Sequence, residues 1–344
     1  KNRCRDCIQR GELMRIPDLQ LHRPANLTDA FSAAQHCASE GFDWLGGGTD
    51  LLCNYKWGLN VRPHLLSLKH IAELHDCSPD SLSSARTLHS ISHDGELASR
   101  YPALVEAAQM VASPLIRRTA TLGGNLLLDT RCWHFNQTAS WREAHGSCLK
   151  AEADTCRVVP KPGNLCVAAY SGDLAPILLA LDASVEWVGP QGSRIVSLSE
   201  VYQEDGIRRF RDKANSEILT RVILPEASET WVSAYQKLRL RETIDFPEGG
   251  VAVALRIDGG FIAEARVATT AYAPIPLLHD SVAAGLVGAP IDIQDESWAS
   301  RLELLADQLR AQVRPMKNTS MSPAYRKRMA GVLLKRAIQK ALAR

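Results

Sequence analysis

Two glycine-rich loops constrain the fold of this chain more than any other feature of its sequence. The first, Gly46-Gly47-Gly48-Thr49-Asp50-Leu51, follows a strand-like segment, and the second is Thr121-Leu122-Gly123-Gly124-Asn125. Consecutive glycines let the backbone take positive φ and approach a ligand without Cβ clashes. The successive N–H groups of such a loop can bind a phosphate, with the Thr49 hydroxyl as a further donor. One such loop could be a tight turn, but two predict contacts with both ends of a pyrophosphate or a ribityl chain.

Neither loop matches a common nucleotide-binding signature. The glycines lack the G-x-G-x-x-G spacing of a dinucleotide-binding fold, and no Gly-Lys-Ser/Thr follows them as in a P-loop. A further candidate, Asp173, stands just before a predicted helix. Its carboxylate could accept a hydrogen bond from a ribose or ribityl hydroxyl, or it could simply cap the helix.

Four of the nine cysteines lie in one segment of weak periodicity. They are Cys132, Cys148, Cys156 and Cys166, separated by 15, 7 and 9 residues. Zinc ribbons and fingers normally contain a short C-x₂₋₄-C pair, and this segment has none. Four thiolates suit either zinc or an iron–sulfur cluster, and the wide, irregular spacing favours a cluster held by a loop.

The other five cysteines are not predicted to form a site. Cys4 and Cys7 make a C-x₂-C pair, but in a stretch (residues 1–13) that we interpret as an N-terminal extension ahead of Met14. The scattered Cys37, Cys53 and Cys77 are expected to be small buried apolar side chains. An odd cysteine count without a secretory signal argues against a disulfide framework and predicts a cytoplasmic protein.

Composition and charge exclude further classes of protein. The chain has 344 residues, 45% of them hydrophobic, which is enough for two domains. The formal net charge is +2, and the densest basic cluster, Arg326-Lys327-Arg328, is interpreted as a solvated helix face. We therefore expect no nucleic acid partner. No run of about 18 apolar residues occurs, so no membrane span is expected.

Periodicity predicts an α+β chain. Helices are expected at 27–40, 101–112, 174–181, 302–312 and 325–343, and strands at 65–68, 185–188, 218–224, 231–240, 250–257 and 266–272. The N-terminal two-thirds should be rich in strands, followed by a small antiparallel sheet with helices. We expect one domain at 14–230, which includes a cysteine-bearing insertion at 129–168, and a second domain at 231–344.

Several motifs together resemble the FAD-binding medium subunit of the xanthine dehydrogenase family, the molybdenum hydroxylases. They are the two glycine loops, Ala112-Ser113-Pro114-Leu115-Ile116-Arg117, Gly172-Asp173-Leu174-Ala175-Pro176, Tyr235-Gln236-Lys237 with Arg241, and Tyr325-Arg326. The similarity extends from about Ile16 to the C-terminus. It implies the two-subdomain FAD-binding fold of the vanillyl-alcohol oxidase type, followed by a C-terminal α+β domain.

The resemblance also implies which residues bind cofactors. FAD would contact Gly46, Gly47, Gly48, Thr49, Asp50, Leu51, Thr121, Leu122, Gly123, Gly124, Asn125, Asp173, Leu219 and Lys237. The segment that begins Arg131-Cys132-Trp133 is similar to the insertion of the 4-hydroxybenzoyl-CoA reductase β subunit. That similarity implies a [4Fe-4S] cluster on Cys132, Cys148, Cys156 and Cys166.

By the same resemblance, the chain is expected to transfer electrons within a dimer of heterotrimers. A large subunit would carry molybdopterin, a small subunit [2Fe-2S] clusters, and ferredoxin or a similar protein would exchange electrons with the complex. Three alternatives remain open. They are a molybdenum hydroxylase or dehydrogenase for another aromatic or N-heterocyclic substrate, a stand-alone flavin oxidoreductase with a structural zinc, and a non-enzymatic assembly scaffold.

Overall fold

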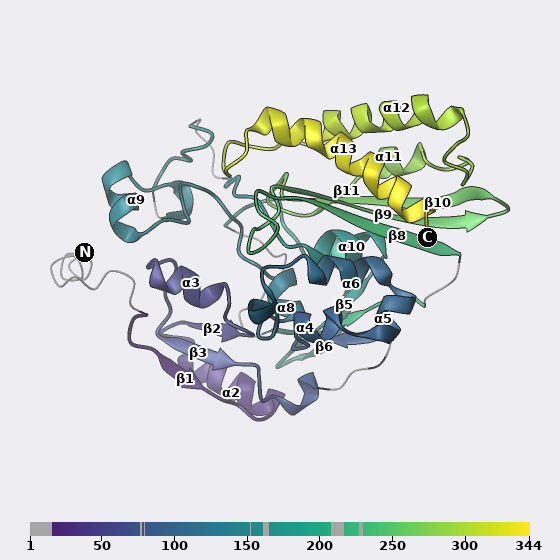
Figure 1. Cartoon of the computed structure of the whole chain (residues 1–344). Coiled ribbons are helices and arrows are strands. Elements are labelled where there is room, and N and C mark those ends of the chain that lie inside the picture. The colour runs from purple at the N-terminus through teal and green to yellow at the C-terminus, as the bar shows by residue number, and fades with distance from the viewer. Residues whose placement is uncertain are drawn as a thin grey trace.

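The computed structural model describes residues 16–75, 78, 80–151, 153–160, 165–207, 217–226 and 230–344. These residues form three sheets with their helices, arranged as three layers (Figure 1). Among the helices of this described part, none combines the length and the apolar character needed to cross a bilayer. The predicted extension at 1–13, with Cys4 and Cys7, lies outside the described residues, as does Cys77.

The first layer is a parallel sheet with the strand order β1-β3-β2. It contains β1 (Gln20–His22), α2 (Leu27–Cys37), β2 (Phe42–Leu45), α3 (Leu51–Lys56), β3 (His64–Ser67) and the 3-10 helix η1 (Ala72–Leu74). Helix α2 begins where the Asn26 side chain accepts from the Asp29 N–H at 2.8 Å. The carboxyl end of β2 leads directly into the first glycine loop, a usual place for ligands in open α/β sheets.

The second layer is an antiparallel sheet with the strand order β4-β7-β5-β6, covered by short helices. Its strands are β4 (Ser81–Ser83), β5 (Ser184–Gly189), β6 (Gly192–Ser197) and β7 (Ile218–Ile223). Its helices are α4 (Leu88–Ser92), α5 (Gly95–Arg100), α6 (Pro102–Gln109), α7 (Pro114–Arg117), α8 (Leu122–Leu126), α10 (Leu174–Ala180) and η3 (Leu198–Glu200). The second glycine loop starts α8, where Thr121 Oγ1 accepts from the Gly124 N–H at 3.2 Å.

Residues 132–168 project from the second layer and contain α9 (Ala139–His145) and η2 (Leu149–Ala151). Arg131 and Ala169 exchange two backbone hydrogen bonds of 2.7 Å at the base of this projection. The segment therefore enters and leaves the layer at neighbouring residues. Figure 1 shows α9 at the upper left, apart from the three sheets.

The C-terminal layer is an antiparallel sheet with the strand order β11-β10-β9-β8. Its elements are β8 (Trp231–Leu238), β9 (Gly249–Asp258), β10 (Phe261–Thr270), β11 (Leu277–Leu278), α11 (Asp280–Ala284), α12 (Ser297–Gln312) and α13 (Pro323–Leu342). Helix α13 packs on one face of β8 and β9, and α10 of the second layer packs on β9 and β10 (Figure 1). Gly259 and Gly260, with φ of +55° and +82°, form the two-residue turn of the β9–β10 hairpin.

The structure confirms a mixed fold with a separate C-terminal sheet, but the expectation of a strand-rich N-terminal two-thirds is wrong. The expected helices at 27–40, 174–181 and 325–343 are present as α2, α10 and α13. The second layer, however, contains helices of only three to eight residues. Such helices are too short to show a 3.6-residue periodicity, and tertiary packing stabilises them.

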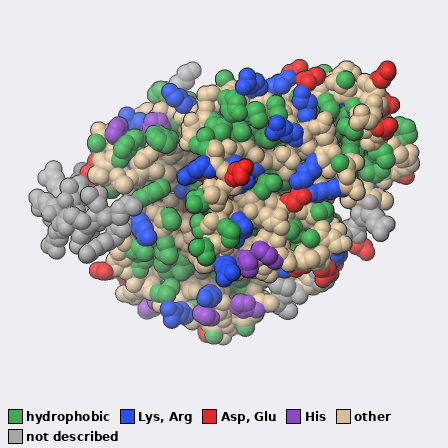
Figure 2. Space-filling model, viewed as in Figure 1, with side chains coloured by type: hydrophobic (Ala, Val, Ile, Leu, Met, Phe, Trp, Pro, Cys, Tyr) green, Lys and Arg blue, Asp and Glu red, His purple; other side chains and the backbone are tan. Residues whose placement is uncertain are grey.

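The basic cluster at 326–328 is not simply a solvated helix face, as the sequence suggested. The Arg326 side chain is fully buried and donates to the carbonyl oxygens of Glu248 at 2.7 Å and Met316 at 2.9 Å. Burial lowers the pKa of this guanidinium, and the nearby Glu248 opposes the decrease. Figure 2 shows other Lys and Arg side chains spread over the visible face among acidic and apolar ones.

Candidate functional site

The two glycine loops lie against each other at the junction of the first two layers. A Cβ atom at Gly46 would lie 2.8 Å from Thr121 Oγ1, and one at Gly47 would lie 1.9 Å from the carbonyl oxygen of Thr119. Only glycine leaves room for this approach. Gly48, with a φ of +69°, then turns the chain into α3. The structure thus brings together the two loops that the sequence singles out.

The backbone N–H groups of the two loops are used differently. In the second loop, Leu122, Gly123 and Gly124 donate to protein oxygens at 2.8 to 3.2 Å. In the first loop, no N–H of residues 46–50 donates to another described residue. The residues of this loop are half-exposed. The first loop therefore offers a run of donors to an anion, and the second loop supports it from behind.

Asp50 and Arg131 join the first glycine loop to the base of the projecting segment. Their side chains form an ion pair in which both are largely buried. The other carboxylate oxygen of Asp50 accepts from Asn54 Nδ2 at 3.3 Å. Because Arg131 immediately precedes Cys132, the glycine loop and the cysteine segment are in direct contact.

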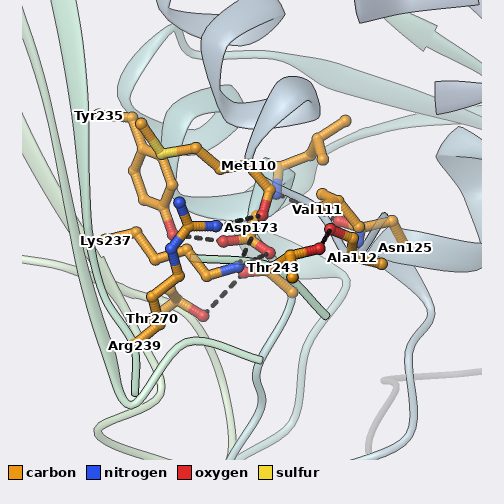
Figure 3. A network of polar contacts seen from close by, with 12 residues as sticks. Met110, Val111, Ala112, Asn125, Asp173, Tyr235, Lys237, Arg239, Thr243 and Thr270 are labelled. Atoms are coloured by element: carbon orange, nitrogen blue, oxygen red, sulfur yellow. Dashed lines mark hydrogen bonds and ion pairs between the residues drawn. The ribbon is translucent and has the colours of Figure 1, made fainter. Parts of the chain in front are cut away.

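Asp173, Tyr235 and Lys237 form a buried polar network between the second layer and the C-terminal sheet (Figure 3). The Asp173 carboxylate accepts from Lys237 Nζ at 3.0 Å and from the Tyr235 hydroxyl at 2.9 Å. Burial raises the pKa of Asp173, and the charge of Lys237 opposes the rise. Asp173 precedes α10 but makes no capping hydrogen bond, so its interpretation as a helix cap is wrong.

The same network reaches the segment before α7. Lys237 Nζ also donates to the Met110 carbonyl at 3.0 Å, and Thr243 Oγ1 donates to the Ala112 carbonyl at 3.4 Å (Figure 3). An open cavity of about 420 Å³ borders this contact. Its charged lining residues are Glu106, Arg117, Arg239, Glu242 and Lys340. The cavity therefore lies where the second layer meets the C-terminal domain.

Two other predicted site residues occupy different surroundings. Asn125 Oδ1 accepts from the Leu174 N–H at 3.2 Å, so this residue connects the second glycine loop to the start of α10 beside Asp173. The Leu219 side chain is buried in the core of the second layer, on β7 opposite Trp187. The side chain of Leu219 is therefore part of the packing.

The four cysteines of the projecting segment converge on one small cavity. Cys132, Cys148, Cys156 and Cys166 all line it and are 6 to 8% exposed. No three of their sulfur atoms lie within 4.8 Å of one another. Burial, with a smaller effect of the neighbouring thiols, raises the pKa of Cys132 to about 12 and that of Cys166 to about 11.

A buried cation stands at the edge of this cavity. Lys150 Nζ lies 2.6 Å from the Asp129 carboxylate, 2.6 Å from the Thr130 hydroxyl and 4.6 Å from the centre of the Phe135 ring. Its charge lowers the pKa of Cys166, against the larger effect of burial. The sequence does not predict this role, because nothing distinguishes a buried lysine in a polar insertion from an exposed one.

Asn318 holds the base of the projecting segment from the C-terminal domain. Its carbonyl accepts from the Trp133 N–H at 2.7 Å, and its side chain donates to the Val167 carbonyl at 2.6 Å. Arg326 donates to the Asn318 side chain at 3.3 Å. The sequence contains no sign of this contact, which joins residues more than a hundred positions apart.

Two family models match this chain. The model described as "FAD binding domain in molybdopterin dehydrogenase" matches residues 17–227, and "CO dehydrogenase flavoprotein C-terminal domain" matches residues 233–341. The first match alone covers more than half of the chain. The boundary between the two matches lies just before β8.

Named relatives are similar over almost their whole length. The carbon monoxide dehydrogenase medium chain of Afipia carboxidovorans is 27% identical over 327 residues, with 94% of this chain and 96% of that protein covered. The xanthine dehydrogenase FAD-binding subunit of Escherichia coli is 25% identical over 328 residues, with 94% and 95% covered. The nicotinate dehydrogenase FAD-subunit of Eubacterium barkeri is 24% identical, with 92% and 97% covered.

Solved structures contain chains with the same fold. Reconstituted CO dehydrogenase from Oligotropha carboxidovorans contains a chain that superposes with a TM-score of 0.75 at 25% identity, with 96% of this chain and 100% of that one covered. A chain of quinoline 2-oxidoreductase from Pseudomonas putida 86 has the same fold, with a TM-score of 0.74 at 21% identity and 96% and 99% coverage. This chain therefore belongs to the family of FAD-binding medium subunits of the molybdopterin dehydrogenases, and is a subunit of an oxidoreductase.

Proposed function

We propose that this subunit is an electron relay that binds FAD at its glycine loops and a [4Fe-4S] cluster at Cys132, Cys148, Cys156 and Cys166. One observation carries the proposal. The cavity lined by the four cysteines is joined to the first glycine loop through the ion pair between Arg131 and Asp50. The cluster and the FAD-binding loop would then be held by adjoining segments of the chain, and a short separation favours electron transfer between the two cofactors.

The first glycine loop fits the pyrophosphate of FAD. The free N–H groups of residues 46–50 form the kind of concave donor array that binds phosphate oxygens. Residues Gly46 to Leu51 would hold the phosphates, and Thr121 to Asn125 would keep that loop in position. By family resemblance, Asp173, Leu219 and Lys237 would also contact FAD; the Leu219 side chain is packed in the core, so its contact would come from the backbone. When bound, FAD supplies chemistry that couples one-electron carriers to two-electron reactions.

The cysteine cavity fits an iron–sulfur cluster better than a zinc ion. Tetrahedral zinc with Zn–S bonds of about 2.3 Å holds its sulfur ligands about 3.8 Å apart. Here no three of the four sulfurs lie within 4.8 Å of one another. Thiolates spread around a common cavity suit a cluster of several irons. Lys150 would place a positive charge beside these thiolates and offset part of their mutual repulsion.

In this proposal the chain is the middle subunit of a dimer of heterotrimers in the cytoplasm. A large subunit would hold molybdopterin and the organic substrate, and a small subunit would hold [2Fe-2S] clusters. Electrons from ferredoxin or a similar donor would enter at the cysteine site and pass by way of the flavin site to the large subunit. The overall reaction would then be similar to that of 4-hydroxybenzoyl-CoA reductase, which the insertion resembles.

The relatives support a second candidate, in which electrons flow outward. They are named as dehydrogenases of carbon monoxide, xanthine and nicotinate. A complex of that type would oxidise another aromatic or N-heterocyclic substrate and pass the electrons to an external acceptor. Anaerobic mixing of the purified complex distinguishes the two directions: reduced ferredoxin bleaches the flavin in the first, and the organic substrate does so in the second.

Serine variants test the cluster. The wild-type chain should contain about four irons and four sulfides and give a low-temperature EPR signal on reduction. Cys132→Ser, Cys148→Ser, Cys156→Ser and Cys166→Ser should each lose or degrade the signal, while FAD content stays unchanged. Cys53→Ser is the matched control, because Cys53 is an exposed thiol on α3 and not the buried side chain that the sequence predicts. Zinc that is present in wild type and absent from Cys132→Ser, with no EPR signal from either protein, would leave a flavoprotein with a structural metal at the four cysteines.

A further inference from the structure

Three metal-ligating side chains meet on one face of the parallel sheet, outside both proposed cofactor sites. His22 ends β1, His64 begins β3, and Cys37 ends α2. In the parallel register His22 lies opposite Leu66, two residues from His64, so both imidazoles project from the same face. Cys37 is 1% exposed and His64 is 5% exposed. The group is thus built from three separate elements and is largely enclosed.

The separations between these ligand atoms are those of a small metal ion. His22 Nε2 lies 3.1 Å from His64 Nδ1 and 3.6 Å from Cys37 Sγ. All three atoms lie within 4.8 Å of one another, and no other group of the described residues meets this criterion. Around a tetrahedral zinc, with Zn–N near 2.0 Å and Zn–S near 2.3 Å, the N···N and N···S separations are about 3.3 and about 3.5 Å, close to those found here.

Glu40 is placed to orient one of the imidazoles. Its carboxylate lies 3.5 Å from His64 Nε2, a buried nitrogen with no hydrogen-bond partner among the described residues. A metal-bound histidine usually presents its second N–H to a carboxylate, which selects the tautomer. With the proton on Nε2, the lone pair of His64 Nδ1 faces His22 and Cys37.

A metal-free histidine pair explains less of this arrangement. In that alternative one imidazole donates to the other, and the Cys37 thiol is a weak donor beside them. It uses the thiol only as a weak donor, 3.6 Å from His22 Nε2, where a metal would make the same sulfur atom a ligand.

We propose that His22, Cys37 and His64 form a zinc site, completed by one water molecule. The ion would join β1, which is only three residues long, to β3 and to the end of α2. Cysteine and histidine ligands select zinc over magnesium or calcium, which prefer oxygen. The metal would anchor β1 to its sheet.

Metal titration of the full-length chain tests the site. With Co²⁺ as the probe, wild type should show the visible bands of a tetrahedral ion and a thiolate charge-transfer band, both reduced by one equivalent in Cys37→Ala. With Zn²⁺, elemental analysis should find one fewer zinc per chain in that variant. Wild type and Cys37→Ala both keep any metal bound at the four cysteines of the insertion. The difference in metal content between them therefore reports on the new site alone, whether or not the cluster proposal holds.

Two further variants and two controls sharpen the result. His22→Gln changes a partly exposed ligand and should reduce Co²⁺ affinity even if Cys37→Ala folds poorly. Glu40→Gln, at an exposed carboxylate, should weaken binding by about 10- to 100-fold, as the loss of an outer partner does. Cys53→Ala and His89→Gln should bind metal as wild type does, although the His89 ring also lies close to that of a second histidine, with the two ring centres 4.2 Å apart.

One result would overturn the proposal. It is equal metal content and equal Co²⁺ spectra in wild type, Cys37→Ala and His22→Gln, with all three folded by circular dichroism. A supporting result has a second signature, because zinc should raise the thermal midpoint of wild type by more than that of Cys37→Ala.

Discussion

At Gly47 the backbone of one loop passes so close to another that a side chain has no space. We expect Gly47→Ala to separate the two loops, because its Cβ would lie 1.9 Å from the Thr119 carbonyl oxygen. Overpacking of this kind typically costs about 1–3 kcal/mol. The displaced loop should also lose most of its FAD, as measured by flavin absorbance of the purified chain.

A second glycine provides the control. Gly95, at the start of α5, has no atom within 4 Å of its missing Cβ, so Gly95→Ala should be neutral or stabilise the chain by up to about 1 kcal/mol. Full flavin occupancy in Gly47→Ala would show that the contact between the loops does not shape the site.

Single residues also show how far the sequence predicts the candidate site. The glycine loops and the four cysteines can be found because their residue types are rare and specific. The pairing of Asp173 with Lys237 cannot be found from the sequence, because 64 positions separate the two residues. Only the packing of α10 on the C-terminal sheet brings them together. The group of His22, Cys37 and His64 is equally hidden, since Cys37 looks like an ordinary small buried residue.

At the scale of elements, His279 links three of them. His279 immediately precedes α11. Its ring is hydrogen-bonded to the side chains of Gln312 in α12, at 2.7 Å, and Thr269 in β10, at 2.9 Å. Burial lowers the pKa of His279 below its ordinary 6.5, so the unfolded chain binds a proton there before the folded chain does. The free energy of unfolding should therefore fall as pH drops below 6.5, and His279 should contribute nothing to the pH dependence above it.

Replacing the titrating group tests this account. The pH dependence of unfolding by urea should be shallower in His279→Gln than in wild type, by at most about 1.4 kcal/mol per pH unit. The exposed His70 is the matched control, and His70→Gln should keep the wild-type slope. Identical slopes in wild type and His279→Gln would contradict the assignment.

Elements also differ in how well they can be predicted. Helix α13, with 20 residues, and the long strands β9 and β10 have enough turns or alternations to show their period. The three-residue β1 and the four-residue α7 do not. The second glycine loop is part of α8, a five-residue helix that depends on its cap and its neighbours.

At the scale of the whole molecule, the buried pair of Asp173 and Lys237 connects the FAD-binding domain to the C-terminal domain. Asp173→Asn would leave the Lys237 ammonium buried without a countercharge, which typically costs about 3–5 kcal/mol. Adding Lys237→Met should recover part of that loss. Urea unfolding of the flavin-free chain measures the free energy of unfolding of each variant without interference from cofactor loss. If the losses of the two single variants simply add in the double variant, the two residues act independently and the prediction is wrong.

The base of the cysteine insertion has a consequence for how the protein is made. Its contacts with Asn318, and through Asn318 with Arg326, come from a part of the chain that is synthesised more than a hundred residues later. N-terminal segments fold first as they emerge. The cysteine segment would thus leave the ribosome long before the C-terminal residues that brace its base. In a chain that holds the proposed cluster, iron would therefore reach a fully braced site only after these residues have been synthesised.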